Sequence, residues 1–297
     1  MNSLSMIDPE HIIPIRNLTI RAKLIVEGMM AGLHKSPYHG FSSEFLEYRS
    51  YNNGETAKRV DWRKYAKTDR AVVRLFEDET NLYANILIDK SASMIYKSKK
   101  MLTKFEYART LAASLAWILI RQRDAVGFAA FDENVKTFLP PRSTNIQLKN
   151  ILKSLDLITA EAKTCCGAAI DTLARGLHKR GLCIIISDFL DDPQQIFQGL
   201  RHLRYKRQDI ILLQILDPAE NEFEQKGNLR LHDLETGQII RIDGNTATNY
   251  FKKGMDKHTD LIKRFCKELH IDYEIISTDE PFQKALLRVL EKRRRML

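Results

Sequence analysis

The sequence has few cysteines, and those it has show no ligand pattern. Only four occur among 297 residues, and Cys165 and Cys166 are adjacent. No CxxC pair is present, and no histidines stand at the spacings typical of zinc sites. A disulfide framework or a structural zinc site is therefore not expected. Such sparing cysteine use fits the reducing environment of the cytoplasm.

Long apolar runs are also missing. The longest strongly apolar segment, Leu111 to Ile120, is too short to span a bilayer, and the first residues lack the apolar centre of a signal peptide. No internal repeat or low-complexity segment is visible. We therefore expect a cytoplasmic protein without a transmembrane segment, for which peripheral contact with a membrane surface stays open.

The charge balance is basic, with 47 Lys and Arg against 38 Asp and Glu and a net charge of +9. This charge permits an acidic protein, a phosphate or a membrane surface as partner. Seven basic and two acidic residues lie between Lys58 and Arg74. Because no aromatic-interleaved RNA motif or zinc finger accompanies this run, we interpret it as a solvated face. Nucleic-acid binding is the less favoured alternative.

Several short apolar runs predict strands that are covered on both faces. They are Asn85 to Asp89, Ala125 to Phe131, Leu182 to Ser187, Ile210 to Leu216 and, more weakly, Ile271 to Ser277. Helical 3–4 spacing follows over 105–119, 261–269 and 282–290. Strands that alternate with helices in this way predict an α/β fold with a doubly wound, mostly parallel, Rossmann-like sheet.

Other segments complete the predicted organisation. Residues 135–141 are expected to form an antiparallel edge strand because Pro140 and Pro141 limit further pairing, and Leu229 to Asp243 a hairpin. A helix is predicted from about Ile15 to Leu33. We divide the chain into residues 1–81, a basic N-terminal segment expected to pack on the main domain, and residues 82–297, the α/β domain.

The first predicted strand ends in polar residues at alternate positions, Asp89, Ser91 and Ser93. In an extended loop alternate side chains face one side, so their oxygens can converge. Ligands of open α/β sheets bind at the carboxyl ends of the strands. A carboxylate with hydroxyls is a hard-oxygen set, which suits Mg²⁺ or Mn²⁺.

Two further oxygens are expected at the same edge. Asp188 ends another apolar strand, and Thr164 precedes a helical pattern. Together with Asp89, Ser91 and Ser93 they form a predicted five-oxygen metal site, with water or another molecule's carboxylate completing the shell. Asp89 and Asp188 would repel each other without a cation between them. The alternatives are a degenerate site without the ion, or loop serines that cap the next turn.

This arrangement resembles the metal-ion-dependent adhesion site of von Willebrand factor type A domains. The segment "KTCCGAAI" matches that family's T-x-x-x-A pattern at the start of a helix. Upstream, the sequence resembles the signature of the bacterial family called domain of unknown function fifty-eight. The matching residues are Arg49, Tyr51, Gly54, Asp61, Trp62, Ala66, Lys67 and Thr68. Glu55 and Lys58 replace the usual Asp and Arg while keeping the charge.

The resemblance implies a type A domain with strand order 3-2-1-4-5-6 and a metal whose open position takes an acidic residue of a partner. It also implies a protein-binding role as an adaptor or chaperone-like factor beside a MoxR-type AAA+ ATPase or its client. An enzyme is not expected, because the sequence contains no P-loop and no Gly-x-Ser-x-Gly elbow, and no residue is predicted to be catalytic. A metal-dependent hydrolase or phosphotransferase is the alternative.

Overall fold

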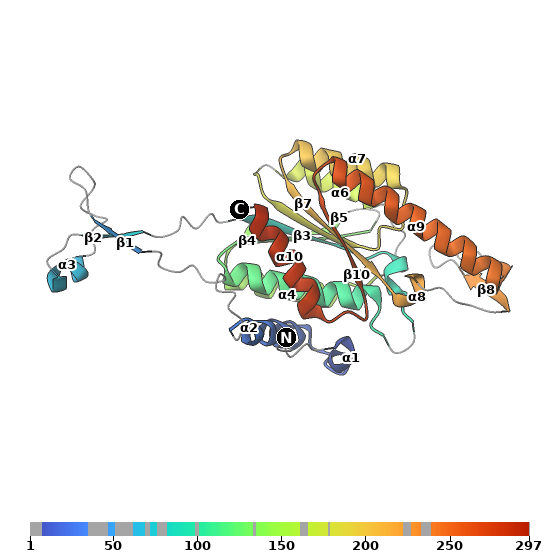
Figure 1. Cartoon of the computed structure of the whole chain (residues 1–297), viewed down its shortest axis with the longest axis horizontal. Coiled ribbons are helices and arrows are strands. Elements are labelled where there is room, and N and C mark those ends of the chain that lie inside the picture. Colours follow the sequence, from blue (N-terminus) through green and yellow to red (C-terminus); the bar gives the residue numbers. More distant parts are fainter. Residues whose placement is uncertain are drawn as a thin grey trace.

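The computed structural model shows a six-stranded sheet with helices on both faces (Figure 1). It describes residues 8–34, 47–50, 62–68, 72–75, 82–98, 101–132, 135–160, 166–177, 179–221, 227–232 and 239–296.

The sheet runs in the order β10-β7-β6-β3-β4-β5. Its strands are β3 (Tyr83–Asp89), β4 (Ala125–Phe131), β5 (Val135–Arg142), β6 (Leu182–Ser187), β7 (Asp209–Leu216) and β10 (Asp272–Ser277). All neighbouring strands are parallel except β4 and β5. Numbered within the domain, this is the order 3-2-1-4-5-6 read from the β5 edge. The predicted doubly wound sheet is therefore confirmed.

The antiparallel edge strand β5 extends past its two prolines. The register with β4 shifts between Val126 and Phe128, and pairing resumes at Arg142. The side-chain amide of Gln147 donates to the carbonyls of Val126 and Pro140 at 2.9 and 3.0 Å. Because a proline cannot donate to a ladder, its place on an edge strand beside a bulge costs the sheet little.

One face of the sheet is covered by α4 (Lys104–Arg121), α5 (Asn145–Leu157), α10 (Phe282–Met296) and α2 (Leu18–His34). Helix α4 begins at the N-cap Thr103, whose hydroxyl accepts from the Glu106 amide at 3.0 Å. A Thr followed three residues later by Glu is a capping-box pattern. Most of α4 is buried because it lies between the sheet and α2.

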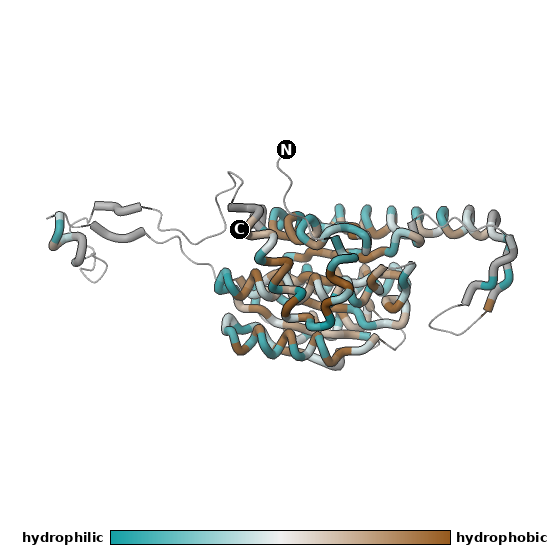
Figure 2. Tube along the Cα trace, turned by 90° about the horizontal axis from the view of Figure 1, so that it is seen from below, coloured by the Kyte–Doolittle hydropathy of each residue, from teal (hydrophilic) through white to brown (hydrophobic). Residues whose placement is uncertain are grey.

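The opposite face carries α6 (Cys166–Gly176), α7 (Pro193–Tyr205) and α9 (Gly244–Glu268), which enclose a second apolar cluster. Helices α6 and α7 approach closely at Gly167, where an added Cβ would lie 2.3 Å from the backbone of Gln195. Helix α9 extends beyond the sheet, and the predicted hairpin of β8 (Asn228–His232) and β9 (Ile239–Asp243) lies at its outer end (Figures 1 and 2). Its turn lies outside the described residues.

The N-terminal segment is described only in parts. After the short α1 (Pro9–Ile12), the predicted helix appears as α2 and packs on α4. There Arg21 contacts the Ile15 carbonyl and pairs with Glu106 at 2.9 Å. Strands β1 (Glu47–Ser50) and β2 (Val72–Leu75) pair antiparallel near α3 (Trp62–Thr68), away from the sheet (Figure 1). The domain boundary near residue 82 stays a prediction.

Among the described helices, none is both long and apolar enough to cross a bilayer.

The C-terminal helix is fixed to the sheet by a buried ion pair. Arg293 of α10 contacts the carboxylate of Asp124, which is 2% exposed and directly precedes β4. Burial raises the pKa of Asp124 to about 6, against the opposing effect of Arg293. A protonated Asp124 therefore stabilises the fold below its ordinary pKa of about 4, and this contribution is lost as the pH rises through 6.

Arg293→Met should lower the free energy of unfolding by about 3–5 kcal/mol at pH 8, because it leaves a buried carboxylate without its partner. The loss should shrink below about pH 4, where the carboxyl group is neutral in both states. Urea unfolding at both pH values tests this, with the exposed Lys284→Met as control. An equal loss at both pH values would mean that packing, and not charge, is what Arg293 contributes.

Candidate metal centre

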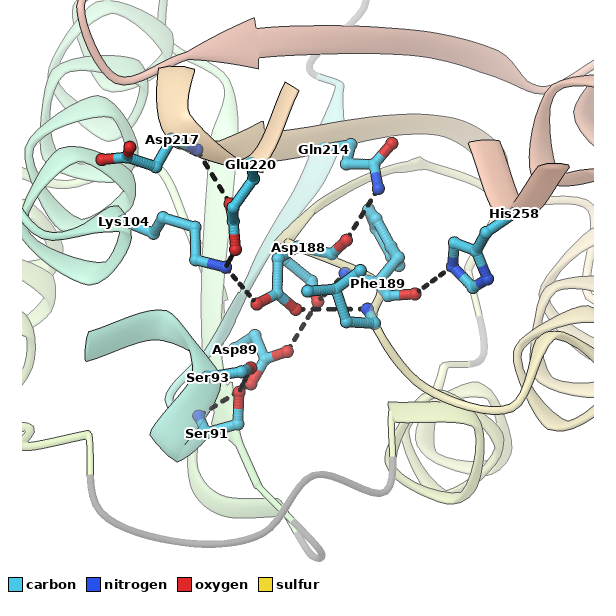
Figure 3. Close-up of polar contacts among 12 residues, drawn as sticks. Asp89, Ser91, Ser93, Lys104, Asp188, Phe189, Gln214, Asp217, Glu220 and His258 are labelled. Carbon is cyan, nitrogen blue, oxygen red and sulfur yellow. Dashed lines mark hydrogen bonds and ion pairs between the residues drawn. The ribbon is translucent and has the colours of Figure 1, made fainter. Parts of the chain in front are cut away.

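The centre lies where the central strand β3 ends. Asp89 is the last residue of β3 and is fully buried between β4 and β6. Its Oδ1 accepts from the Ser91 amide at 2.8 Å, and the hydroxyls of Ser91 and Ser93 lie 3.0 Å apart. A 3-10 turn, η2 (Ala92–Ile95), follows Ser91 and turns Ser93 back toward the strand end (Figure 3). The structure therefore brings these three predicted residues together.

The loop after β6 reaches the same place. Ser187, the last residue of β6, donates its hydroxyl to Asp89 Oδ2 at 2.6 Å and accepts from the Phe189 amide at 2.9 Å. This bond joins the ends of two neighbouring strands. The contribution of Ser187 was not predicted from the sequence, because a serine inside an apolar strand end resembles a packing residue.

The backbone of this loop is held in an unusual conformation. Phe189 is buried and has a φ of 53°, in the left-handed region that costs a non-glycine residue energy. His258 of α9 donates to its carbonyl at 2.7 Å, and Gln214 of β7 donates to the Asp188 carbonyl at 2.8 Å. These bonds come from two other elements and fix the direction of Asp188 (Figure 3).

The carboxylate of Asp188 points to a lysine. Lys104 Nζ lies 2.8 Å from Asp188 Oδ2 and 2.6 Å from Glu220 Oε1, and its side chain is fully buried. Asp188 Oδ1 accepts from the Leu190 amide at 3.3 Å. Sequence reasoning missed Lys104. The available signal was its place in the first turn of α4, where the helix dipole disfavours a cation that has no partner.

Thr164 lies in the segment 161–165, outside the described residues, so its place in the site stays a prediction. Helix α6 begins two residues later at Cys166, whose amide donates to Asp191 Oδ2 at 2.9 Å. Burial, and then the charges of Asp89 and Asp191, hold the pKa of the Cys166 thiol well above its usual range. The start of α6 therefore lies close to the Asp89 carboxylate.

Asp89 is a buried charge without an ion pair in the described part of the chain. Burial, and then the nearby charge of Asp188, raise its pKa to about 7, while hydrogen bonds from Ser187 and Ser91 lower it. The described residues contain no group of three His, Cys, Asp or Glu side chains that could hold a metal. Instead the chain offers one uncompensated carboxylate beside two hydroxyls. This donor set fits a hard cation such as Mg²⁺ that keeps several waters.

The sheet order and the cluster at the strand end agree with what the sequence resemblance to von Willebrand factor type A domains implies for an α/β domain. The family profile described as "Protein of unknown function DUF58" matches residues 47–260. The chain belongs to this family.

Uncharacterized proteins of Mycobacterium bovis and of Mycobacterium tuberculosis H37Rv are each 25% identical over 292 residues, which cover 97% of this chain and 91% of theirs. Among solved structures, BatB of Bacteroides thetaiotaomicron aligns over 71% of this chain and 98% of its own, with 19% identity and a TM-score of 0.46. The SpRpn10 VWA domain aligns over 70% and 94%, with 12% identity and a TM-score of 0.40.

Asp89→Asn should stabilise the metal-free protein at pH 8, because it removes a buried charge while an amide can still bond to Ser187. The protonated carboxyl group favours folding below its ordinary pKa of about 4, and this advantage is lost as the pH rises through 7. The gain should therefore be absent near pH 4 and reach up to about 4 kcal/mol above pH 7.

Urea unfolding in EDTA at pH 4 and pH 8 measures this difference, with the exposed Asp156→Asn as the matched control. A variant that is less stable than the wild type at pH 8 would contradict the expectation. It would mean that the hydrogen bonds of Asp89 outweigh the cost of burying its charge.

Proposed function

We propose that the protein is a non-enzymatic, divalent-metal-dependent protein-binding module of the cytoplasm. In this proposal it acts as an adaptor or chaperone-like partner of a MoxR-type AAA+ ATPase or of that ATPase's client. The observation that carries the proposal is the buried Asp89 carboxylate, which lies beside Ser91 and Ser93 without a cationic partner among the described residues.

The residues proposed to hold the ion are Asp89, Ser91 and Ser93, with Thr164 and Asp188 completing the set. Bound there, Mg²⁺ or Mn²⁺ would supply a positive charge with an open position for an oxygen ligand. Ser187 and the Ser91 amide orient Asp89, since each donates to one of its carboxylate oxygens. Ser93 is only half-buried, which leaves one side of the cluster accessible. A partner's Asp or Glu side chain fits such an opening.

The described surroundings favour binding over catalysis. The histidine shown beside the centre, His258, uses its Nε2 on the Phe189 carbonyl instead of facing Asp89 (Figure 3). Cys166 is buried, and its raised pKa keeps the thiol protonated, which makes it a poor nucleophile. The proposal therefore assigns no catalytic residue.

Asp89→Ala should remove metal binding and partner binding together. In titration calorimetry with Mn²⁺, we expect the affinity to fall at least about 100-fold, because the main anionic ligand is lost. In parallel, immobilised wild type should capture a MoxR-type ATPase from native lysate in Mg²⁺ and lose it in EDTA. Asp156→Ala, which alters an exposed carboxylate on α5, should behave like the wild type.

Metal-dependent capture that survives in Asp89→Ala would refute this role for the centre. Hydrolysis of a phosphate ester that disappears in Asp89→Ala would instead support the metal-dependent hydrolase or phosphotransferase. Nucleic-acid affinity that falls steeply with salt and ignores EDTA would point to the basic surface.

A further inference from the structure

A buried lysine connects three loops at the same edge of the sheet. Lys104, the first residue of α4, lies between Asp188, which follows β6, and Glu220, in α8 (Pro218–Asn221), which follows β7. The Tyr96 ring lies 5.9 Å from Nζ. The two ion pairs of Lys104, at 2.8 Å to Asp188 and 2.6 Å to Glu220, compensate the charge of the buried ammonium group.

The side chains around this lysine leave an unbalanced charge. Asp89, Asp188 and Glu220 supply three carboxylates against one ammonium, so the group carries a net charge of −2 when all four ionise. Asp217 is also buried but points away from Lys104, and its carboxylate accepts from the amides of Ser98 and Ala219 (Figure 3). One divalent cation at Asp89 would bring the group to neutrality.

We propose that Lys104 sets the charge of the metal centre, so that the bound ion remains attractive to a partner's carboxylate. This inference rests on the proposed function. Lys104 offsets the charge of Asp188, so Asp89 is the carboxylate of the proposed ligand set whose charge no described ion pair offsets. Without Lys104 the group would carry −3. The ion would then bind more tightly, and the centre as a whole would attract an anion less.

A purely structural lysine would behave differently. If Lys104 served only to join α4 to the two loops, its loss would disorder Asp188 and weaken metal binding. If Lys104 sets the charge, its loss should instead strengthen metal binding. Glu220 provides the matching comparison, because Glu220→Gln removes one negative charge and keeps an oxygen that can accept from Lys104. The group would then carry −1, and it should bind the ion less tightly than the wild type.

The test is titration of metal-free protein with Mn²⁺ by calorimetry, for wild type, Lys104→Met and Glu220→Gln. We expect Lys104→Met to bind Mn²⁺ about tenfold more tightly and Glu220→Gln about tenfold more weakly, as charge changes near a partly screened ion imply. Lys153→Met, an exposed lysine on α5, should leave the affinity unchanged. Circular dichroism checks that each variant is folded.

A second measurement tests whether the open coordination position of the bound ion accepts a carboxylate. Acetate, a bare carboxylate, should displace water from the protein-bound Mn²⁺ and lower the water-proton relaxation rate. Lys104→Met should need about tenfold more acetate than the wild type for the same effect.

The outcomes separate the two proposals. A wild type that binds no Mn²⁺ would overturn the proposed function itself. A wild type that binds it, together with a folded Lys104→Met that binds it no more tightly, would overturn only the role of Lys104. If Lys104→Met does not fold, Glu220→Gln decides, because unchanged or tighter Mn²⁺ binding in that variant would also overturn the role of Lys104.

Discussion

The structure at this edge of the sheet depends on the cost of burying carboxylates. Asp89 ends β3, Asp188 directly follows the neighbouring strand β6, and both are almost inaccessible to water. An isolated buried charge costs several kcal/mol, so each must be protonated, paired or bound to an ion. The two carboxylates are stabilised in different ways. Asp188 has Lys104 and several fixed bonds, whereas Asp89 has hydrogen bonds alone. This asymmetry is what makes Asp89 the candidate ligand.

The same constraint organises the loops. Several bonds join the described segments at this edge, among them Ser187 to Asp89, Lys104 to Glu220, and Ser98 to Asp217. His258 adds a contact from α9, the helix whose far end carries the β8–β9 hairpin. A displacement of α9 would therefore act on the carbonyl next to Asp188. The positive φ of Phe189 persists because the hydrogen bonds around it stabilise this conformation by more than its strain costs.

Much of this could be predicted from the sequence, for a physical reason. Strands buried on both faces must be apolar throughout, so β4 and β6 appear in the sequence as uninterrupted runs with the observed bounds. Asp89, Ser91 and Ser93 lie within five residues of one another, so their alternate spacing alone predicts that their oxygens lie close together in the folded chain. The continuation of β5 past Pro141 to Arg142 was harder to foresee, because it depends on a register shift with β4.

The Lys104 pair could not be predicted in the same way. Its partners lie 84 and 116 residues away, and an ion pair between distant residues leaves no periodicity in the sequence. The topology brings them together: α4 starts at the edge where β6 and β7 end, so one long side chain can reach both following loops.

Charge acts on two length scales in this molecule. The net charge of +9 attracts acidic partners over about a Debye length, ~8–10 Å at physiological salt, without regard to their detailed shape. At the centre the sign is reversed, because the carboxylates outnumber Lys104. An acidic side chain drawn in by the long-range field would thus be repelled at the last step unless a cation occupies the site. In the proposed function, the bound metal is what permits the partner's acidic side chain to contact the centre. Selectivity for that partner then arises because the whole chain is positive while the metal-free centre is negative.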